Sequence, residues 1–247
     1  MSSAIRSLLP AQPNPLVGRT AELAMICERL VAGDTRLLTL TGPAGVGKTR
    51  VALAAAAQLA GLPGRFADGV VFVDLAPVRD PKLVLSSLAT AAGLLDTGSR
   101  SLLQLLTDTL EQRQLLLELD NFEQGLPAAA PLADLLAGCP GLVLLVTSRV
   151  PLQLRWERTL RIAPLAVPDL TTPLAPPDTL ALVPAVALFV ERARSRCPEV
   201  VVPEKEARLV ARLVAQLDGL PLALELAAAR SATLSLATIA NRLESRL

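Results

Sequence analysis

From residue 37 to residue 50 the chain reads Leu37-Leu38-Thr39-Leu40-Thr41-Gly42-Pro43-Ala44-Gly45-Val46-Gly47-Lys48-Thr49-Arg50. A short apolar run, typical of a buried strand, leads into the pattern Gly-x-x-x-x-Gly-Lys-Thr, and the alanine-rich segment 51–60 behind it is typical of a helix. Glycines let the backbone turn so that successive N–H groups converge on phosphate oxygens, and a helix N-terminus adds positive charge. The stretch therefore predicts a phosphate-binding loop between a strand and a helix.

The phosphates of a nucleotide and their Mg²⁺ have predicted partners in this loop. Lys48 would reach the β- and γ-phosphates, and the hydroxyl of Thr49 would hold Mg²⁺. The alternative is a glycine-rich turn that only connects two elements, and against it the chain has only two lysines besides Lys48. The remaining cofactor-binding positions that we predict in the loop are Gly42, Pro43, Ala44, Gly45, Val46, Gly47 and Arg50.

Composition excludes several classes of protein. A formal net charge of +1 provides no basic face for nucleic acid, and four Phe, one Trp and no Tyr are too few for base-stacking platforms. Direct binding of nucleic acid by this segment is therefore not expected. The absence of histidine excludes His-based acid–base or metal chemistry. Cys27, Cys139 and Cys197 are too widely spaced for a metal site, and their odd number is typical of reduced thiols in a cytosolic protein.

Hydropathy gives no sign of a membrane segment or of a leader. No uninterrupted apolar run approaches the ~18 residues needed to cross a bilayer. Residues 1–10 lack the long apolar core of a secretory signal. We therefore expect a cytoplasmic protein that does not contact membranes.

The order of the elements divides the chain into four parts. Residues 1–15 form a proline-containing extended lead-in, and apolar strands then alternate with helices over 16–165. Near-continuously apolar strands joined by helices predict an α/β fold with a mainly parallel five-stranded sheet flanked by helices. Proline is concentrated over 166–184, which predicts a linker, and 185–247 shows only helical periodicity, which predicts a small all-helical domain. The predicted strands are 37–41, 69–75, 114–120, 141–149 and 158–165.

Two predicted strands end in polar residues that suit a phosphate site. The strand 114–120 ends in Asp120, and a buried parallel strand delivers such a carboxylate to the edge where it can hold Mg²⁺ directly or through water. The strand 141–149 ends in Arg149, which could form a forked contact with a γ-phosphate. The alternatives are an Asp that only shapes the turn after the strand and an Arg on a surface loop.

Five motifs occur in one order along the chain, and their combination resembles the STAND class of signalling ATPases. The resemblance is to the NB-ARC branch, in particular to the nucleotide-binding modules of bacterial LuxR- and AfsR-type regulators, and spans 14–247. Alone, Gly18-Arg19 is also consistent with a simple turn that enters a helix. The motifs are Val17-Gly18-Arg19, the phosphate loop, Leu115 to Asp120 with Asn121, Thr147-Ser148-Arg149, and Gly219-Leu220-Pro221-Leu222-Ala223.

The resemblance implies a role for each motif. Val17, Gly18 and Arg19 would lie near the base and ribose, and Pro221 would touch adenine from the helical domain. Lys48, Asp120 and Arg149 would form the catalytic set, with Asp120 as the Walker B carboxylate and Arg149 as the sensor of the γ-phosphate. Thr49 and Asp120 would hold Mg²⁺. A base held between two domains would couple the identity of the nucleotide to their orientation.

Two positions depart from the family pattern. Thr20 stands where a Glu usually follows Gly-Arg. Asn121 stands where many motor ATPases carry a Glu that polarises the attacking water, and the nearest carboxylate is Glu123, whose role the sequence does not fix. We therefore expect at most slow hydrolysis of ATP.

The leading expectation is a regulatory switch, in signal transduction and transcription regulation, that is closed with ADP and open and homo-oligomeric with ATP. The family's winged-helix and sensor-repeat domains should follow in the natural protein, so a fragment is expected. The alternatives are an AAA-type motor, a small-molecule kinase, or a scaffold that has lost nucleotide binding. A GTPase lacks support because no Asn-Lys-x-Asp motif occurs.

Overall fold

The computed structural model describes residues 9–94, 101–124, 126–171, 173, 175–196 and 204–244. Residues 1–8 of the predicted lead-in and Cys197 therefore lie outside the described residues. The chain divides into two compact units. The first consists of Met1–Leu16, Ala21–Pro43 and Lys48–Ile162, and the second of Val17–Thr20, Ala44–Gly47 and Ala163–Leu247.

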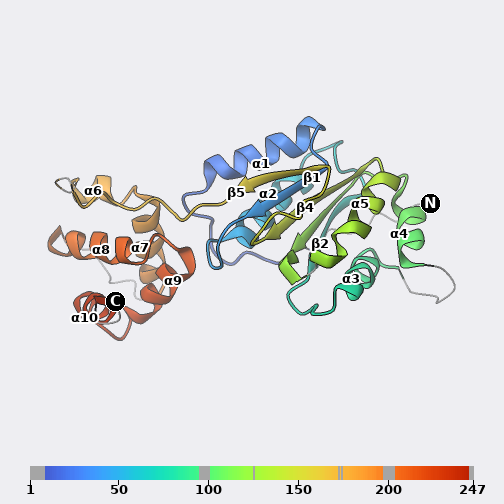
Figure 1. Cartoon of the computed structure of the whole chain (residues 1–247). Coiled ribbons are helices and arrows are strands. Elements are labelled where there is room, and N and C mark those ends of the chain that lie inside the picture. The colour runs from blue at the N-terminus through green and yellow to red at the C-terminus, as the bar shows by residue number, and fades with distance from the viewer. Residues whose placement is uncertain are drawn as a thin grey trace. The chain divides into compact units, whose positions relative to one another are not determined.

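The first unit is built on a five-stranded sheet (Figure 1) in the order β2-β3-β4-β1-β5. All four pairs of neighbouring strands are parallel, which confirms the predicted α/β fold. Strands β3 and β4 are buried at every residue, as expected of central parallel strands covered on both faces. Edge strand β5 is half-buried or exposed throughout and ends earlier than predicted, ahead of Pro164, which has no N–H for a ladder. The strands are β1 (Leu37–Thr41), β2 (Gly69–Asp74), β3 (Leu115–Asp120), β4 (Leu142–Ser148) and β5 (Glu157–Arg161).

Helices cover both faces of this sheet. Alternate residues of β3, such as Leu117 and Leu119, form one core with helices α3 (Val84–Ala91), α4 (Leu102–Leu110) and α5 (Ala129–Gly138). The opposite face is covered by α2 (Lys48–Ala60), whose fully buried Ala55 and Ala56 let the helix approach the sheet closely. Beside α2 lies α1 (Thr20–Ala32), and the Cys27 thiol donates a hydrogen bond to Gln58 Oε1 of α2. Short 3₁₀ turns span Pro81–Leu83 (η1), Phe122–Gln124 (η2) and Leu126–Ala128 (η3).

The second unit is helical and has its own hydrophobic core. Phe189, Leu213 and Leu224 are fully buried members of that core. Within the predicted linker, Pro177 starts the short helix α6, which was not predicted from the sequence. The helices are α6 (Pro177–Leu180), α7 (Pro184–Arg196), α8 (Glu204–Gln216), α9 (Pro221–Arg230) and α10 (Leu236–Glu244).

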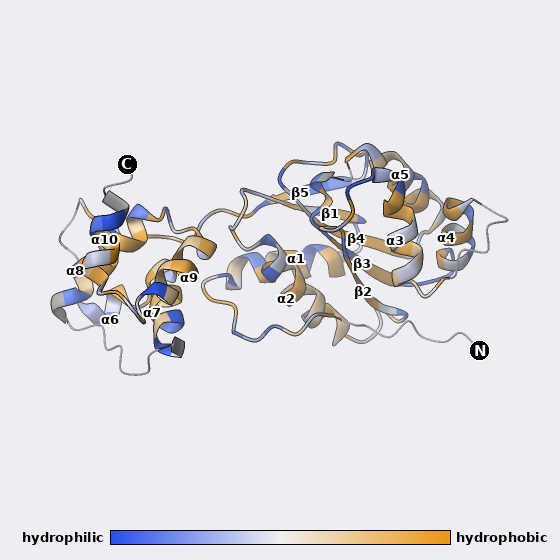
Figure 2. Cartoon of the chain, turned by 90° about the horizontal axis from the view of Figure 1, so that it is seen from below, coloured by the Kyte–Doolittle hydropathy of each residue, from blue (hydrophilic) through white to orange (hydrophobic). Residues whose placement is uncertain are grey.

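Hydropathy follows the two cores. Figure 2 shows hydrophobic residues on the helices α3 and α5 of the first unit and on α9 of the second. Leu222 and Leu226 of α9 are exposed, whereas Leu224 between them is fully buried. Among the described residues, no helix combines the length and the apolar character that crossing a membrane requires.

Candidate functional site

The predicted phosphate loop connects the end of β1 to the first turn of α2. Gly45 and Gly47 have φ angles of 76° and 94°, a region that side chains with a Cβ rarely adopt. The motif therefore has glycine at these two positions because the backbone of the loop takes positive φ angles there. The helix begins at Lys48 itself, so the N–H groups of its first turn come directly after the loop.

Lys48 is held by the loop that precedes it. Its ammonium donates hydrogen bonds to the carbonyl oxygens of Gly42, at 2.9 Å, and Pro43, at 3.0 Å. Burial lowers the pKa of Lys48 from its ordinary value; the negative charges of Glu123 and Asp120 act in the opposite direction, and the positive charge of Arg149 lowers the pKa further. The predicted catalytic lysine therefore lies within electrostatic range of both predicted strand-end residues.

Asp120 joins the phosphate-loop helix to the end of β4. Its Oδ1 accepts hydrogen bonds from the hydroxyl of Thr49, at 2.7 Å, and from that of Thr147, at 2.6 Å. The Thr147 hydroxyl in turn accepts a hydrogen bond from the backbone N–H of Asn121, at 2.9 Å. Asp120 is only 4% exposed, so this network fixes its carboxylate at the carboxyl end of β3.

The Thr49–Asp120 pair fits the chemistry of Mg²⁺. This cation takes oxygen ligands, usually one or two carboxylates, and completes its shell with water and substrate phosphates. Among the described residues, no three His, Cys, Asp or Glu side chains gather as a metal site. The oxygens of Thr49 and Asp120 are of the kind that Mg²⁺ takes beside the phosphates of a nucleotide.

A second carboxyl group, Glu118, lies next to this network and was not predicted as functional. Glu118 is fully buried in β3, between Phe72 of β2 and Leu145 of β4 in register. Burial, with a smaller contribution from the charge of Asp120, raises its pKa to about 8. Neither carboxyl oxygen has a hydrogen-bond partner among the described residues. The sequence did carry a signal, a single charged residue inside an apolar strand.

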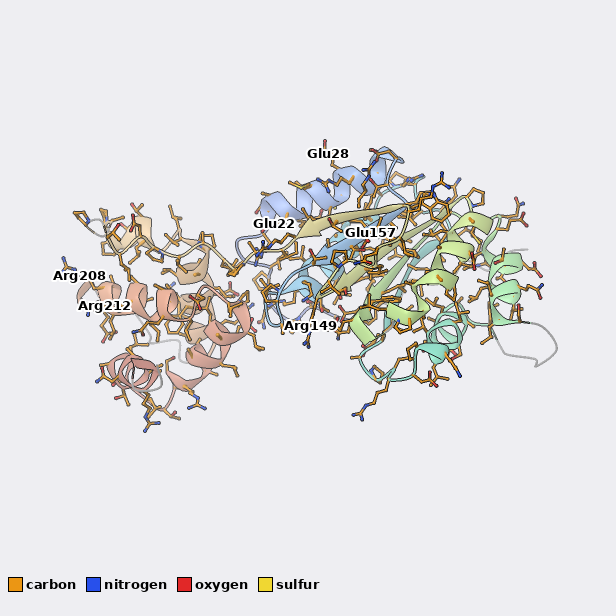
Figure 3. The ribbon with its side chains drawn as sticks, in the orientation of Figure 1. Glu22, Glu28, Arg149, Glu157, Arg208 and Arg212 are labelled. Atoms are coloured by element: carbon orange, nitrogen blue, oxygen red, sulfur yellow. The ribbon has the colours of Figure 1, made fainter. Side chains whose placement is uncertain are left out.

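Arg149 is paired with a carboxylate of the same unit. Its Nε donates to Glu123 Oε1 at 3.0 Å, and the side chains are 63% and 20% exposed, respectively. Figure 3 shows Arg149 beyond the end of its strand, at the edge of the sheet where the parallel strands end. Glu123 lies in η2, close behind Asn121, which has a φ of 61°. The structure therefore supplies a contact for Glu123 that the sequence did not reveal.

Arg19 is buried in the second unit. Its Nη2 donates to the carbonyl oxygen of Val46, at 3.1 Å, and to that of Ala163, at 2.7 Å. Gly18 is also constrained, because a Cβ there would lie 2.5 Å from Cβ of Pro184, while Val17 packs against the helical core. Arg19 therefore connects the tip of the phosphate loop to the segment after β5. These contacts show that Gly18-Arg19 does more than form a turn at the start of a helix. The predicted proximity of Val17, Gly18 and Arg19 to the base and ribose stays a prediction.

Pro221 occupies the first turn of α9, where its missing N–H costs no hydrogen bond. A Cβ at Gly47 would lie 3.9 Å from Cγ of Pro221, and Leu222 N donates to the carbonyl oxygen of Gly45 at 3.1 Å. These residues belong to the second unit, which includes Ala44–Gly47. Contact of Pro221 with adenine stays a prediction.

Arg50 was predicted to bind the cofactor, but in the structure it contacts the backbone of the lead-in segment. Its Nη2 donates to the carbonyl oxygens of Asn14, at 2.7 Å, and Pro15, at 3.2 Å. In this structure Arg50 therefore joins α2 to the lead-in segment. Its predicted role in cofactor binding remains untested.

Comparison with known proteins agrees with this geometry. The family model described as "AAA domain" matches residues 31–154. The chain is 36% identical over 217 residues to "Putative HTH-type transcriptional regulator Rv0890c" of Mycobacterium tuberculosis, covering 87% of this chain and 22% of that protein. It is 33% identical over 235 residues to the regulatory protein AfsR of Streptomyces griseus, covering 91% of this chain and 22% of AfsR.

The fold also occurs in a solved structure. A Signal Transduction ATPase with Numerous Domains (STAND) protein with a tetratricopeptide repeat sensor, from Pyrococcus horikoshii, superimposes with a TM-score of 0.56 at 16% identity. The match covers 99% of this chain and 34% of that one, and at this identity it shows the fold alone. The matched segment 31–154 contains the phosphate loop, Asp120 and Arg149. By these matches and this geometry, the chain belongs to the AAA domain family of P-loop proteins.

Proposed function

We propose that this chain is the nucleotide-binding switch module of a larger transcriptional regulator, and that it binds ATP and ADP with Mg²⁺. The observation that carries the proposal is the hydrogen-bond network in which Asp120 accepts from Thr49 and Thr147. It joins Asp120, which we take as the Walker B carboxylate, to the first turn after the phosphate loop, where P-loop proteins hold Mg²⁺. The names of the two regulators, of which the chain covers 22%, support the regulatory context.

Each side chain has a defined part in this proposal. Lys48 would exchange its bonds to Gly42 and Pro43 for bonds to the β- and γ-phosphates, so its position is prepared before the ligand arrives. Mg²⁺ supplies charge neutralisation of the phosphates when it is bound. Thr49 and Asp120 would hold the cation, while Thr147 keeps the carboxylate of Asp120 in place.

The residue after Asp120 favours a switch over a fast enzyme. Asn121 cannot act as a base, and its backbone is turned by a φ of 61° with its N–H held by Thr147. We therefore propose slow hydrolysis of ATP to ADP and phosphate. An ADP-bound closed state and an ATP-bound open, oligomeric state are part of the same proposal.

The domain boundaries belong to the proposal as well. We assign nucleotide binding to 16–165 and a lid to the helices of 185–247, and we place winged-helix and sensor-repeat domains in the remainder of the natural protein. Adenine would be recognised by Val17, Arg19 and Pro221. The fixed conformation of the loop tip, with Val46 bonded to Arg19 and Gly45 to Leu222, supports a role for these residues in reporting which nucleotide is bound.

The test compares the wild-type chain with Lys48→Ala and Lys82→Ala. Lys82 is an exposed lysine of η1 and provides a matched control. Mg·ADP at a hundred times its Kd should stabilise the wild type and Lys82→Ala by about 2.7 kcal/mol, or roughly 5–10 °C in Tm, and should leave Lys48→Ala unchanged. Mass analysis of denatured, freshly purified wild type should detect ADP. A wild-type chain that gains no stability from Mg·ADP or Mg·ATP would overturn the proposal.

A further inference from the structure

We propose that Glu123 competes with the γ-phosphate for Arg149 and thereby sets how strongly the site prefers ATP to ADP. Glu123 is in this view a specificity-determining residue, not a base. The inference rests on the proposed function, because it concerns the same nucleotide site.

The contact between the two side chains is the first step. Arg149 uses Nε to bond Glu123 Oε1 at 3.0 Å, and among the described residues this is its only hydrogen bond to a side chain. The second oxygen of Glu123, Oε2, is buried and has no hydrogen-bond partner in the described part of the chain. Arg149 thus offsets the negative charge of Glu123, whose Oε2 has no hydrogen bond among the described residues.

The backbone holds both partners in place. Strands β3 and β4 are neighbours in register, with Leu119 opposite Val146, so the residues just beyond the two strands emerge side by side. Asn121 turns the chain with a φ of 61°, and its N–H is bonded to the hydroxyl of Thr147. Glu123 therefore reaches Arg149 because of strand register and turn geometry.

Competition follows from the charges around the loop. A γ-phosphate adds negative charge near Lys48, and both Glu123 and Arg149 act electrostatically on the Lys48 ammonium. The Nη donors of Arg149 can fork onto phosphate oxygens while Nε stays bonded to Glu123, but the negative charge of Glu123 beside the guanidinium weakens its attraction for a γ-phosphate. ADP lacks the γ-phosphate and depends less on this attraction. The Glu123–Arg149 pair therefore opposes binding of ATP more than binding of ADP.

The expected size of the effect is small and measurable. The Arg149 side chain is 63% exposed, and exposed ion pairs contribute about 0.2–1 kcal/mol, which corresponds to at most about a fivefold change in affinity. Glu123→Gln should therefore tighten Mg²⁺ with a non-hydrolysable ATP analogue by roughly two- to fivefold. The Kd for Mg·ADP should change by less, so that the ratio of the two Kd values shifts toward ATP.

The experiment is isothermal titration of the wild type, Glu123→Gln, Arg149→Ala and the double variant with both nucleotides. Glu28→Gln is the matched control, since Glu28 is exposed on α1 and Figure 3 shows it well apart from Arg149 within the first unit. Glu28→Gln should bind like the wild type. In the Arg149→Ala background, Glu123→Gln should no longer change the ratio of the two Kd values. Glu123→Ala should repeat the effect of Glu123→Gln.

The outcomes separate the inference from the proposed function. Suppose that the wild type binds both nucleotides. The competition is refuted if Glu123→Gln leaves the ratio of their Kd values unchanged. It is also refuted if Glu123→Gln changes that ratio as much in the Arg149→Ala background as in the wild type. Loss of hydrolysis in Glu123→Gln with an unchanged Kd ratio would identify Glu123 as a base instead. If the wild type binds neither nucleotide, the proposed function fails and the inference fails with it.

Discussion

Replacement of Glu118 by Leu should stabilise the first unit, and by more at high pH than at low pH. Glu118 is fully buried between Phe72 and Leu145, and its carboxyl oxygens have no hydrogen-bond partner among the described residues. Leucine has no polar atom and is no smaller than glutamate, so the substitution removes an unsatisfied buried group without opening a cavity. Removal of such a group alone is worth about 1 kcal/mol or more.

The pH dependence follows from the raised pKa of Glu118. Below pH 4.5, its ordinary pKa, the carboxyl is neutral in both the folded and the unfolded chain. Between pH 4.5 and about 8 the folded chain binds one proton more than the unfolded chain, so the stability of the wild type falls as pH rises. Because one pKa unit corresponds to about 1.4 kcal/mol, the upper limit of this loss is roughly 5 kcal/mol.

The assay is unfolding in urea, followed by circular dichroism at several pH values, for the wild type, Glu118→Leu and the exposed control Glu28→Leu. Relative to the wild type, Glu118→Leu should gain about 1 kcal/mol at pH 5 and about 3 kcal/mol at pH 8, which corresponds to roughly 6–12 °C in Tm at the higher pH. Glu28→Leu should show no gain that grows with pH. If Glu118→Leu is less stable than the wild type at pH 8, the view of Glu118 as a buried neutral acid is refuted.

Three further predictions concern single contacts in the first unit. Gly141→Ala should destabilise by about 3 kcal/mol in urea unfolding, because the added Cβ would lie 2.3 Å from the carbonyl oxygen of Arg113, whereas Gly61→Ala, with 3.5 Å of clearance, should cost less than about 1 kcal/mol. Thr147→Val should lower stability by about 2 kcal/mol and weaken Mg·ADP binding in titration, since it removes a donor to Asp120; unchanged affinity for Mg·ADP would contradict the proposed role of the network. Burial raises the pKa of Cys139 to about 11, so its peptide should resist alkylation at pH 8 until urea is added, and prompt labelling of the folded chain would show that the thiol is not buried.

Local patterns were sufficient for the sheet. The strands β1, β3 and β4 are buried on both faces of the sheet. Parallel strands in this environment have continuous apolar runs instead of alternating apolar and polar residues, and such runs are visible in the sequence. The glycine motif located the loop for a similar reason, because its positive φ angles impose a residue type. Both predictions depend on neighbours in the sequence.

Contacts between distant segments were harder to predict. The pairing of Glu123 with Arg149 depends on the register of β3 and β4, and on a turn at Asn121 in the left-handed region, where asparagine occurs more often than most residues but not by rule. The burial of Glu118 depends on which face of β3 the alanines of α2 cover. The helix within the predicted linker, at Pro177, was missed because proline breaks a helix in its interior and also begins one in its first turn.

The open side of β5 bears on how copies of the chain can meet. Among the described residues β5 pairs only with β1, and its outer N–H and C=O groups could in principle accept another strand. Its short length and its exposed Arg158 and Arg161 oppose this, because a short strand with charged side chains is a poor template for a second strand. Extension of the sheet from one molecule into the next through β5 is thereby disfavoured.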